Sequence, residues 1–206
     1  MISVSLNEVY SETYKALRSV NIEWSLAKDC ANKAKWLAQH GQYFLGSILK
    51  TADLYNKKDI SISINENTSK KPLSSALMAL LLVEYVSAKK ITWEGYIDSS
   101  KFLLAAMGII AEEQKINLIL ENEQKDIIAF TKDKEIYVNA NLDTKISSYY
   151  FLKTYDFIKK KNIKFTNLKK NKNVTKLNAQ CWERLKSMAF ETYVPESETS
   201  KSRAGY

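Results

Sequence analysis

The chain has 206 residues and a mass of 23.6 kDa, the size of one ordinary domain, which we place over residues 1–206. Its 45% hydrophobic and 26% charged residues are a globular composition, which excludes a chain disordered throughout. Five glycines and two prolines exclude collagen-like and proline-rich classes. With one histidine and two cysteines, no His- or Cys-rich metal or haem site is predicted, and we expect no cofactor.

The sequence also bears on the compartment. The N-terminus has no basic segment followed by a long apolar one, so no secretory signal is predicted. The most apolar runs, residues 76–83 and 102–111, are shorter than the ~20 residues that a membrane helix needs. Cys30 and Cys181 have no neighbouring cysteine, which fits a reducing compartment, and we do not expect a disulfide between them. These features predict a cytoplasmic protein with no membrane partner.

Residues 1–41 predict a helical hairpin. Ser5 and Glu8 have the spacing of a capping box, and apolar side chains then recur at helical spacing to about Asn21. A second helix is predicted from about Glu23 to His40. Gly41 follows it, at the position where glycine commonly ends a helix.

Residues 42–191 predict the body of an α/β fold, with α+β as the alternative, in which helices pack on a mixed sheet. Helical spacing continues over residues 41–55, and isoleucines alternate with serines over residues 60–64, which predicts a strand. Two similar units then follow, about 25 residues apart. In each, a pair of serines (Ser74-Ser75, then Ser99-Ser100) leads an apolar run into a predicted strand, at residues 90–97 and 115–121.

The second half of the body is less regular. Residues 126–131 and 135–140 alternate and predict a hairpin. The aromatic-rich residues 146–159 fit a helix or a strand. Residues 175–191 predict a final amphipathic helix, and residues 192–206 form a polar C-terminal arm.

The positive charge is concentrated in one lysine-rich segment, residues 153–176. It holds nine lysines and one acid, Asp156, so it carries the whole net charge of +8 while the rest of the chain is neutral. Such a segment can bind phosphate backbones non-specifically. It contains no arginine, however, and lysine-rich loops are more typical of a solvated surface, so we do not expect nucleic acid to be the main partner.

Few residues carry a chemical signal. No glycine-rich nucleotide-binding motif occurs. Glu112 and Glu113 end the second serine-led helix and are candidate carboxylates for acid–base chemistry, although adjacent glutamates at a helix end are usually solvated. The sole histidine, His40, is expected to cap its helix, where the helix dipole favours the charged imidazole.

The C-terminal arm holds the remaining candidates. It is too polar to bury itself, yet it carries an aromatic residue and a proline directly after a helix. It is either a frayed terminus or an arm that docks on its own pocket or on a neighbouring subunit. Two cations can bind a carboxylate or phosphate there, with hydroxyls as hydrogen-bond partners. The candidate ligand or interface residues are Tyr193, Pro195, Ser197, Ser200, Lys201 and Arg203.

Two stretches resemble a known family. The first is the opening Ser5-Leu6-Asn7-Glu8-Val9 with Trp24, Lys35-Trp36-Leu37 and His40-Gly41; the second is Trp182, Leu185 and Ala189 followed by Thr192-Tyr193-Val194-Pro195-Glu196-Ser197-Glu198-Thr199-Ser200. In these residues the chain is similar to a bacterial family called domain of unknown function 3726. The middle two-thirds of the chain is not matched. Lys201 stands where the family has arginine, and a Gly/Ala-rich, acid-terminated run is not found after it.

The family's name states no reaction, so the functional expectation rests on the residues. We expect an enzyme or enzyme accessory of small-molecule metabolism with its pocket near the C-terminal arm. One alternative is an assembly protein whose arm lies at a subunit interface of a homo-oligomer. Another is a weak, non-specific nucleic-acid binder acting through the lysine-rich segment.

Overall fold

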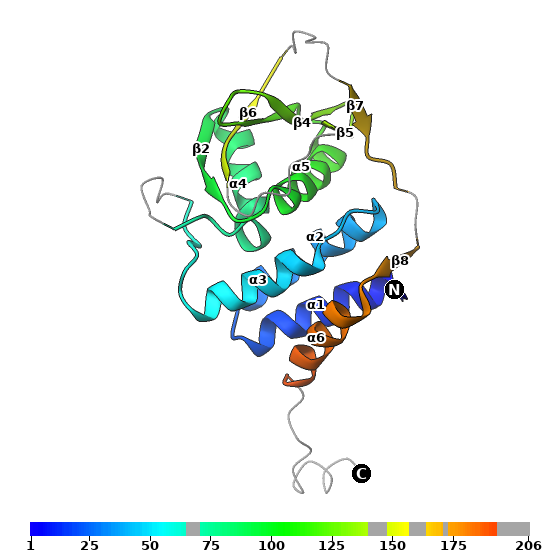
Figure 1. Ribbon diagram of the computed structural model, residues 1–206. Helices are drawn as coiled ribbons and strands as arrows, with labels where there is room; N and C mark the ends of the chain where they lie inside the picture. The colour runs from blue at the N-terminus through cyan, green and yellow to red at the C-terminus, as the bar shows by residue number, and fades with distance from the viewer. Residues whose placement is uncertain (65–70, 140–147, 157–163, 171–172, 193–206) are drawn as a thin grey trace, which may run out of the picture.

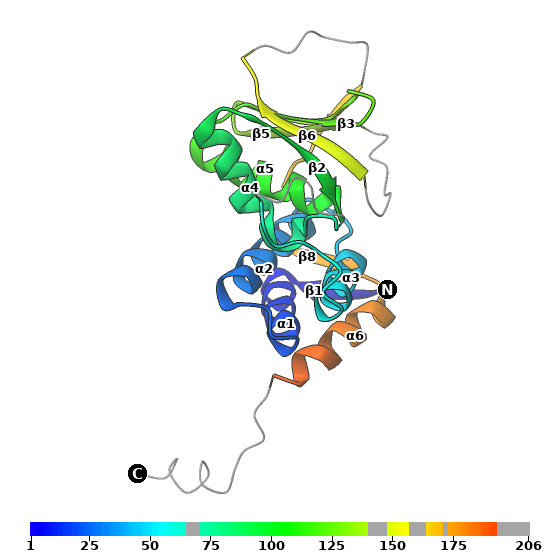
Figure 2. The same cartoon turned by 90° about the vertical axis from the view of Figure 1, so that its left-hand side faces the viewer.

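The computed structural model describes residues 1–64, 71–139, 148–156, 164–170 and 173–192 (Figure 1). Two layers are stacked in it. One is formed by helices α1, α2, α3 and α6, and the other by a six-stranded sheet with helices α4 and α5 on one face (Figures 1 and 2). None of the described helices is both long enough and apolar enough to cross a membrane.

The predicted N-terminal hairpin is confirmed by α1 (Leu6–Ser19) and α2 (Trp24–Gln39), which pack together. The capping box forms: Glu8 N–H donates to Ser5 Oγ at 3.2 Å, and Ser5 N–H donates to Glu8 Oε2 at 2.9 Å. Gly41 has a φ of 67°, and Gln42 N–H reaches back to the Leu37 carbonyl at 2.8 Å, which ends α2.

The same layer contains α3 (Leu45–Asn56) and α6 (Ala179–Phe190). The predicted last helix begins later than expected. Val174–Leu177 forms strand β8, which pairs antiparallel with an N-terminal strand β1 (Ile2–Ser5) that the sequence did not predict. Asn178 then caps α6, its side-chain oxygen accepting from Cys181 N–H at 3.0 Å.

The two helix–strand units are present. The first is α4 (Ser75–Lys89) with β2 (Thr92–Ile97), and the second is α5 (Ser100–Gln114) with β3 (Leu118–Asn122). Each helix ends at a lysine in the left-handed conformation, and the two helices pack on each other. Their strands do not pair. Strand β6 (Ser148–Thr154) lies between them and pairs antiparallel with both.

The hairpin prediction is also confirmed. Strands β4 (Ile127–Lys132) and β5 (Glu135–Asn139) are joined by Asp133 and Lys134, which both have positive φ values, as in a tight two-residue turn. Strand β7 (Phe165–Asn167) adds to β5, so the strand order is β2-β6-β3-β4-β5-β7.

The α/β class is confirmed, but two details are corrected. The expected mixed sheet is antiparallel in all five of its strand pairings, because β6 separates the two parallel strands β2 and β3. The strand predicted over residues 60–64 is wrong. Among its described neighbours only Leu73 forms a bridge with it, at Ser61, so the alternating isoleucines find no partner strand.

The two faces of the sheet differ. The inner face packs on α4 and α5, with Leu118, Leu120 and Leu152 almost fully buried. The outer face carries aromatic cross-strand pairs, including Phe130 with Tyr137 (ring centroids 5.0 Å apart), and none of the described helices covers it (Figure 2). The helices thus meet the sheet only from inside, and they leave hollows where their ends reach its edge.

Candidate functional site

A hollow of about 450 Å³ lies where the ends of α2 and α5 meet the edge of the sheet formed by β5 and β7. Figure 1 shows the elements that surround it, with the upper end of α2 below β5 and β7. We call it the His40 cavity. It is lined by the imidazole of His40, the carboxylates of Glu112 and Glu135, the amide of Asn167 and three lysines, together with Gly108, Ile136 and Leu168; the lysines are Lys134, Lys169 and Lys170.

His40 is held in one orientation. Its ring stacks on Trp36, one helical turn earlier, with ring centroids 3.7 Å apart and an interplanar angle of 24°. Its Nδ1 lies 2.7 Å from the Trp36 carbonyl oxygen. Because a carbonyl oxygen only accepts, we assign the hydrogen of the neutral ring to Nδ1, which leaves Nε2 unprotonated.

The electrostatics of His40 differ from the sequence expectation. Burial lowers the pKa of the imidazole, and the hydrogen bond to Trp36 and the charge of Glu112 only partly oppose this. The helix dipole was expected to favour the charged ring, but desolvation dominates. His40 therefore presents a neutral ring, and its Nε2 has no hydrogen-bond partner among the residues that the structure describes.

Gly108 allows Trp36 to take this position. A methyl group at Gly108, in the middle of α5, would overlap the six-membered ring of Trp36. The indole therefore lies directly against the α5 backbone, and its Nε1 donates to Glu112 Oε1 at 3.2 Å. This contact joins residues 76 positions apart in the chain and places the Trp36–His40 stack beside Glu112.

Both carboxylates of the cavity are occupied by neighbouring donors. Glu112 accepts from Trp36 at one oxygen and from Lys170 Nζ at the other, at 2.6 Å. Glu135 Oε2 accepts from the Tyr137 hydroxyl at 2.6 Å and from Asn167 Nδ2 at 2.7 Å. The two other lysines have no ion pair within the described ranges, so the hollow has uncompensated positive charge.

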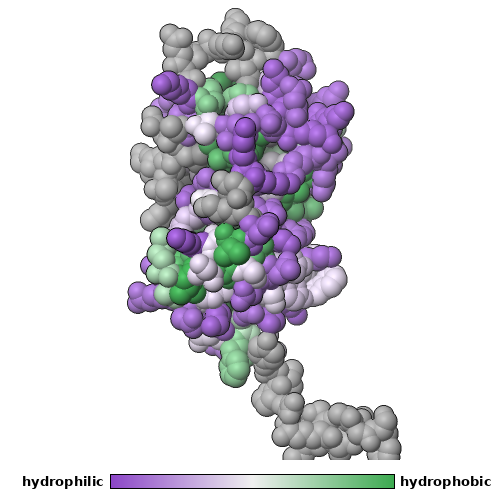
Figure 3. Space-filling view, turned by 90° about the vertical axis from the view of Figure 1, so that its right-hand side faces the viewer, coloured by the Kyte–Doolittle hydropathy of each residue, from purple (hydrophilic) through white to green (hydrophobic). Residues whose placement is uncertain are grey.

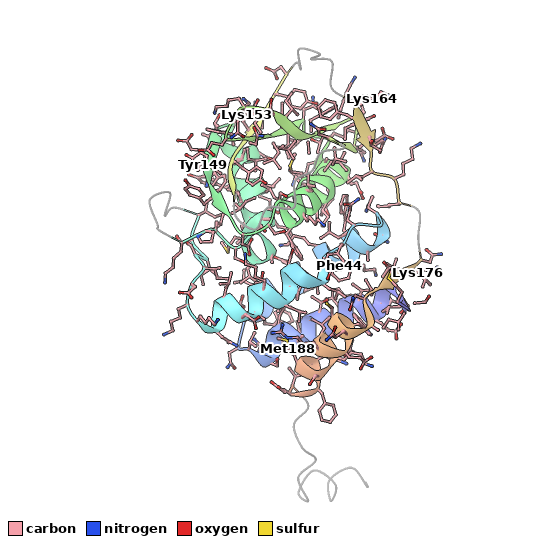
Figure 4. All side chains as sticks on the ribbon, in the orientation of Figure 1. Phe44, Tyr149, Lys153, Lys164, Lys176 and Met188 are labelled. Carbon is pink, nitrogen blue, oxygen red and sulfur yellow. The ribbon has the colours of Figure 1, made fainter. Side chains whose placement is uncertain are left out.

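The surface around the cavity is suited to a polar ligand. Figure 3 looks onto the side of the molecule at which β7 and the end of α2 lie, and its upper part is mostly hydrophilic. Of the described lysines of the segment 153–176, only Lys169 and Lys170 line the cavity. Lys153 and Lys164 lie on the sheet, whereas Lys176 lies beside the helical layer (Figure 4).

The sequence candidates have different outcomes. Glu112 lies in the cavity with His40 and with Lys170 of the lysine-rich segment. Glu113 does not: it is exposed and lines a second hollow, on α2, α4 and α5, which Trp36 also lines. The arm candidates are outside the described residues; they are Tyr193, Pro195, Ser197, Ser200, Lys201 and Arg203.

The sequence reasoning missed the role of Trp36, although its spacing of four from His40 was a signal that the two rings share a helix face. It also missed a buried polar contact. Asp98 accepts from the N–H and hydroxyl of Ser75, at 2.8 and 2.6 Å, and from the Thr51 hydroxyl at 3.3 Å. Burial raises the pKa of Asp98, and these hydrogen bonds oppose the shift. This contact ties α3 to the start of α4.

Two observations bear on cofactors and redox chemistry. Within the described ranges, no group of three or more His, Cys, Asp or Glu side chains is arranged to hold a metal ion. Cys30 and Cys181 are free thiols, and burial raises the pKa of Cys30 to about 12, so this thiol is a poor nucleophile.

The chain was also compared with known proteins. No protein-family model, no curated protein and no solved structure matches it.

Proposed function

We propose that this protein binds a small anionic metabolite in the His40 cavity, as an enzyme or enzyme accessory of small-molecule metabolism. One observation carries the proposal: His40, whose Nε2 we assign as unprotonated, lines the same hollow as Lys134 and Lys169, while both carboxylates there already accept from neighbouring donors. Charge-assisted hydrogen bonds from lysine are suited to carboxylates and phosphates. A neutral imidazole beside such a group can accept a proton from the ligand.

The arrangement supports proton transfer at one atom. The Trp36 carbonyl and indole hold the ring, so that Nε2 is the nitrogen left to accept a proton. The imidazolium that forms is stabilised by the charge of Glu112. This charge partly opposes the lowering of the His40 pKa by burial. In this role His40 is a general base, Lys134 and Lys169 bind the anion, and Glu112 supports the charged ring.

The wider context is part of the same proposal. Two free thiols fit a reducing compartment, so we place the activity in the cytoplasm. Membership of the bacterial family domain of unknown function 3726 likewise remains our proposal from the residues at the two ends of the chain. The arm at residues 193–206 lies outside the described residues, so the site is defined from the described residues alone.

The sole histidine makes a direct test available, because its imidazole gives one set of NMR signals. Inorganic phosphate, citrate and a panel of anionic metabolites are titrated while the pH titration of His40 is followed. A ligand in the cavity is expected to raise the pKa of His40. Lys169→Ala and Lys134→Ala are expected to weaken binding about five- to tenfold, since each removes a charge-assisted bond.

The matched control is Lys132→Ala, because Lys132 is on the same hairpin but does not line the cavity. An unchanged His40 titration with every anion, or equal weakening by all three lysine variants, would reject the proposal.

The nucleic-acid alternative receives less support. Lys153 is paired with Glu121 at 2.8 Å and Lys170 with Glu112, so two lysines of the segment are already engaged. The assembly alternative depends on the arm, outside the described residues, and no specific contact favours it.

A further inference from the structure

The second hollow, of about 460 Å³, lies on α2, α4 and α5 and differs in character from the His40 cavity. We call it the helix groove. Its apolar wall is made by Trp36, Leu80, Ile109 and Ile110, and its carboxylates come from all three helices: Asp29, Glu84 and Glu113. Figure 2 shows α2 and α4 on one side of the molecule, below the sheet.

The three carboxylates have no direct partner among the described residues, although the charge of Asp29 acts on the buried Lys33, four residues further along α2. None of them accepts a hydrogen bond or forms an ion pair within the part of the chain that the structure describes. The one cation lining the groove, Lys35, donates instead to the Asn7 side chain at 3.1 Å. The helix groove therefore combines an apolar wall with uncompensated negative charge.

Helix α4 adds exposed apolar surface next to the groove. Leu81 and Tyr85 are 42% and 38% exposed. They lie one turn apart, and Leu81 is three residues from the groove residue Glu84, a spacing at which two residues share a helix face. The opposite side of α4 is buried in the core, so this helix is apolar around most of its circumference. Such a helix is usually covered on both sides.

We propose that the helix groove and the Leu81–Tyr85 row bind a basic amphipathic helix of a partner protein. Apolar side chains at spacings of three and four would pack on the groove wall and on the two exposed residues, as in other helix-in-groove complexes. Lysines or arginines on the flanks would meet the three carboxylates. The negative charge of these carboxylates repels phosphate groups, which argues against a nucleic acid or a lipid headgroup as the occupant. The inference is independent of the His40 cavity.

The test uses the full chain and two fluorescein-labelled peptides of 16 residues in fluorescence anisotropy. Both carry leucine at positions 3, 6, 7, 10, 13 and 14; the other positions are lysine and alanine in one, and glutamate and alanine in the other. We expect the basic peptide to bind at least tenfold more tightly than the acidic one. Its affinity should fall as salt is raised from 50 to 300 mM.

Exposed-residue variants locate the binding. Glu84→Gln combined with Glu113→Gln, and Tyr85→Ser, are each expected to weaken the basic peptide at least fivefold. The matched controls are Glu183→Gln, on α6, and Tyr96→Ser, a 56% exposed tyrosine on β2; neither lines the groove, and both should leave affinity within twofold. Circular dichroism melts verify that each variant is folded.

Three results would overturn the proposal. The two peptides could bind equally, or the controls could weaken binding as much as the groove variants. Alternatively, light scattering could show a dimer that Tyr85→Ser dissociates while the peptide does not bind; a second copy of this chain would then be the occupant.

Discussion

Trp36 lines the helix groove and stacks on His40 of the His40 cavity, yet the two hollows favour ligands of opposite charge. Adjacent glutamates at the end of α5 show the difference. Glu112 is half-buried, and both of its oxygens accept from neighbours; Glu113 is exposed and has no such partner in the described chain. Successive residues of a helix point about 100° apart, so neighbours in sequence can belong to different surfaces. Chemical roles at helix ends therefore depend on which surface a residue faces.

The comparison also separates two kinds of recognition. In the cavity, lysines and an imidazole surround carboxylates that are already satisfied, so a small anion can add to them. In the groove, unpaired carboxylates surround apolar side chains, so a larger cationic and apolar partner fits better. Trp36 is the residue whose displacement should affect both.

The largest expected effect is that of Gly108→Ala, which would displace the ring that lines the groove and supports His40. The new methyl group overlaps the Trp36 ring, so the indole must move away from α5. Overpacking of this kind costs about 1–3 kcal/mol, and we expect a loss of that size in urea unfolding. Gly46→Ala is the control: its methyl group would lie 3.3 Å from the Tyr43 ring, and in a helix alanine favours folding by about 0.5–1 kcal/mol over glycine. Equal stability of the two variants would contradict the close packing of Trp36 on Gly108.

A smaller effect is expected from acidification, and it sharpens the description of the cavity. Burial lowers the pKa of His40 in the folded chain, so between its folded and ordinary values the unfolded chain binds the extra proton. The stability contributed by the neutral ring is present above the ordinary histidine range and is lost as pH falls through the folded pKa. Unfolding free energies at pH 7.5, 6.5 and 5.5 should therefore decrease, and His40→Phe should reduce this decrease. A larger decrease in His40→Phe would contradict the assignment.

The smallest effect distinguishes the two glutamates. Glu112→Gln keeps an acceptor for Trp36 but removes the ion pair with Lys170; since the carboxylate is one-third exposed, solvent screening limits the expected loss to about 0.5–1 kcal/mol. Glu113→Gln should change stability by less than about 0.5 kcal/mol. Thermal unfolding of both variants measures the difference. If Glu113→Gln proved the more destabilising, the assignment of the residues to different surfaces would be wrong.

Parts of the fold that depend on short-range contacts were predictable. The capping box at Ser5 and Glu8 and the left-handed Gly41 fixed the ends of helices by hydrogen bonds over a few residues. The hairpin turn at Asp133 and Lys134 was predictable for the same reason, because it also depends on contacts between residues close in sequence. In contrast, residues 146–159 fitted either a helix or a strand, and only pairing with β2 and β3 on both sides makes β6 a strand. The isoleucines at residues 60–64 had the right alternation but no strand to pair with.

The candidate site was likewise predictable only in part. Glu112 was a candidate because a carboxylate at the end of that helix could face a cleft at the strand ends, but nothing in the sequence related it to His40. The sequence by itself determined where several of the helices begin and end, and that two helix–strand units follow one another. The tertiary structure decided the antiparallel strand order, the neutral state of His40 and the separation of Glu112 from Glu113. These depend on contacts such as Trp36 with Glu112, 76 positions apart, and on burial, which periodicity along the chain does not encode.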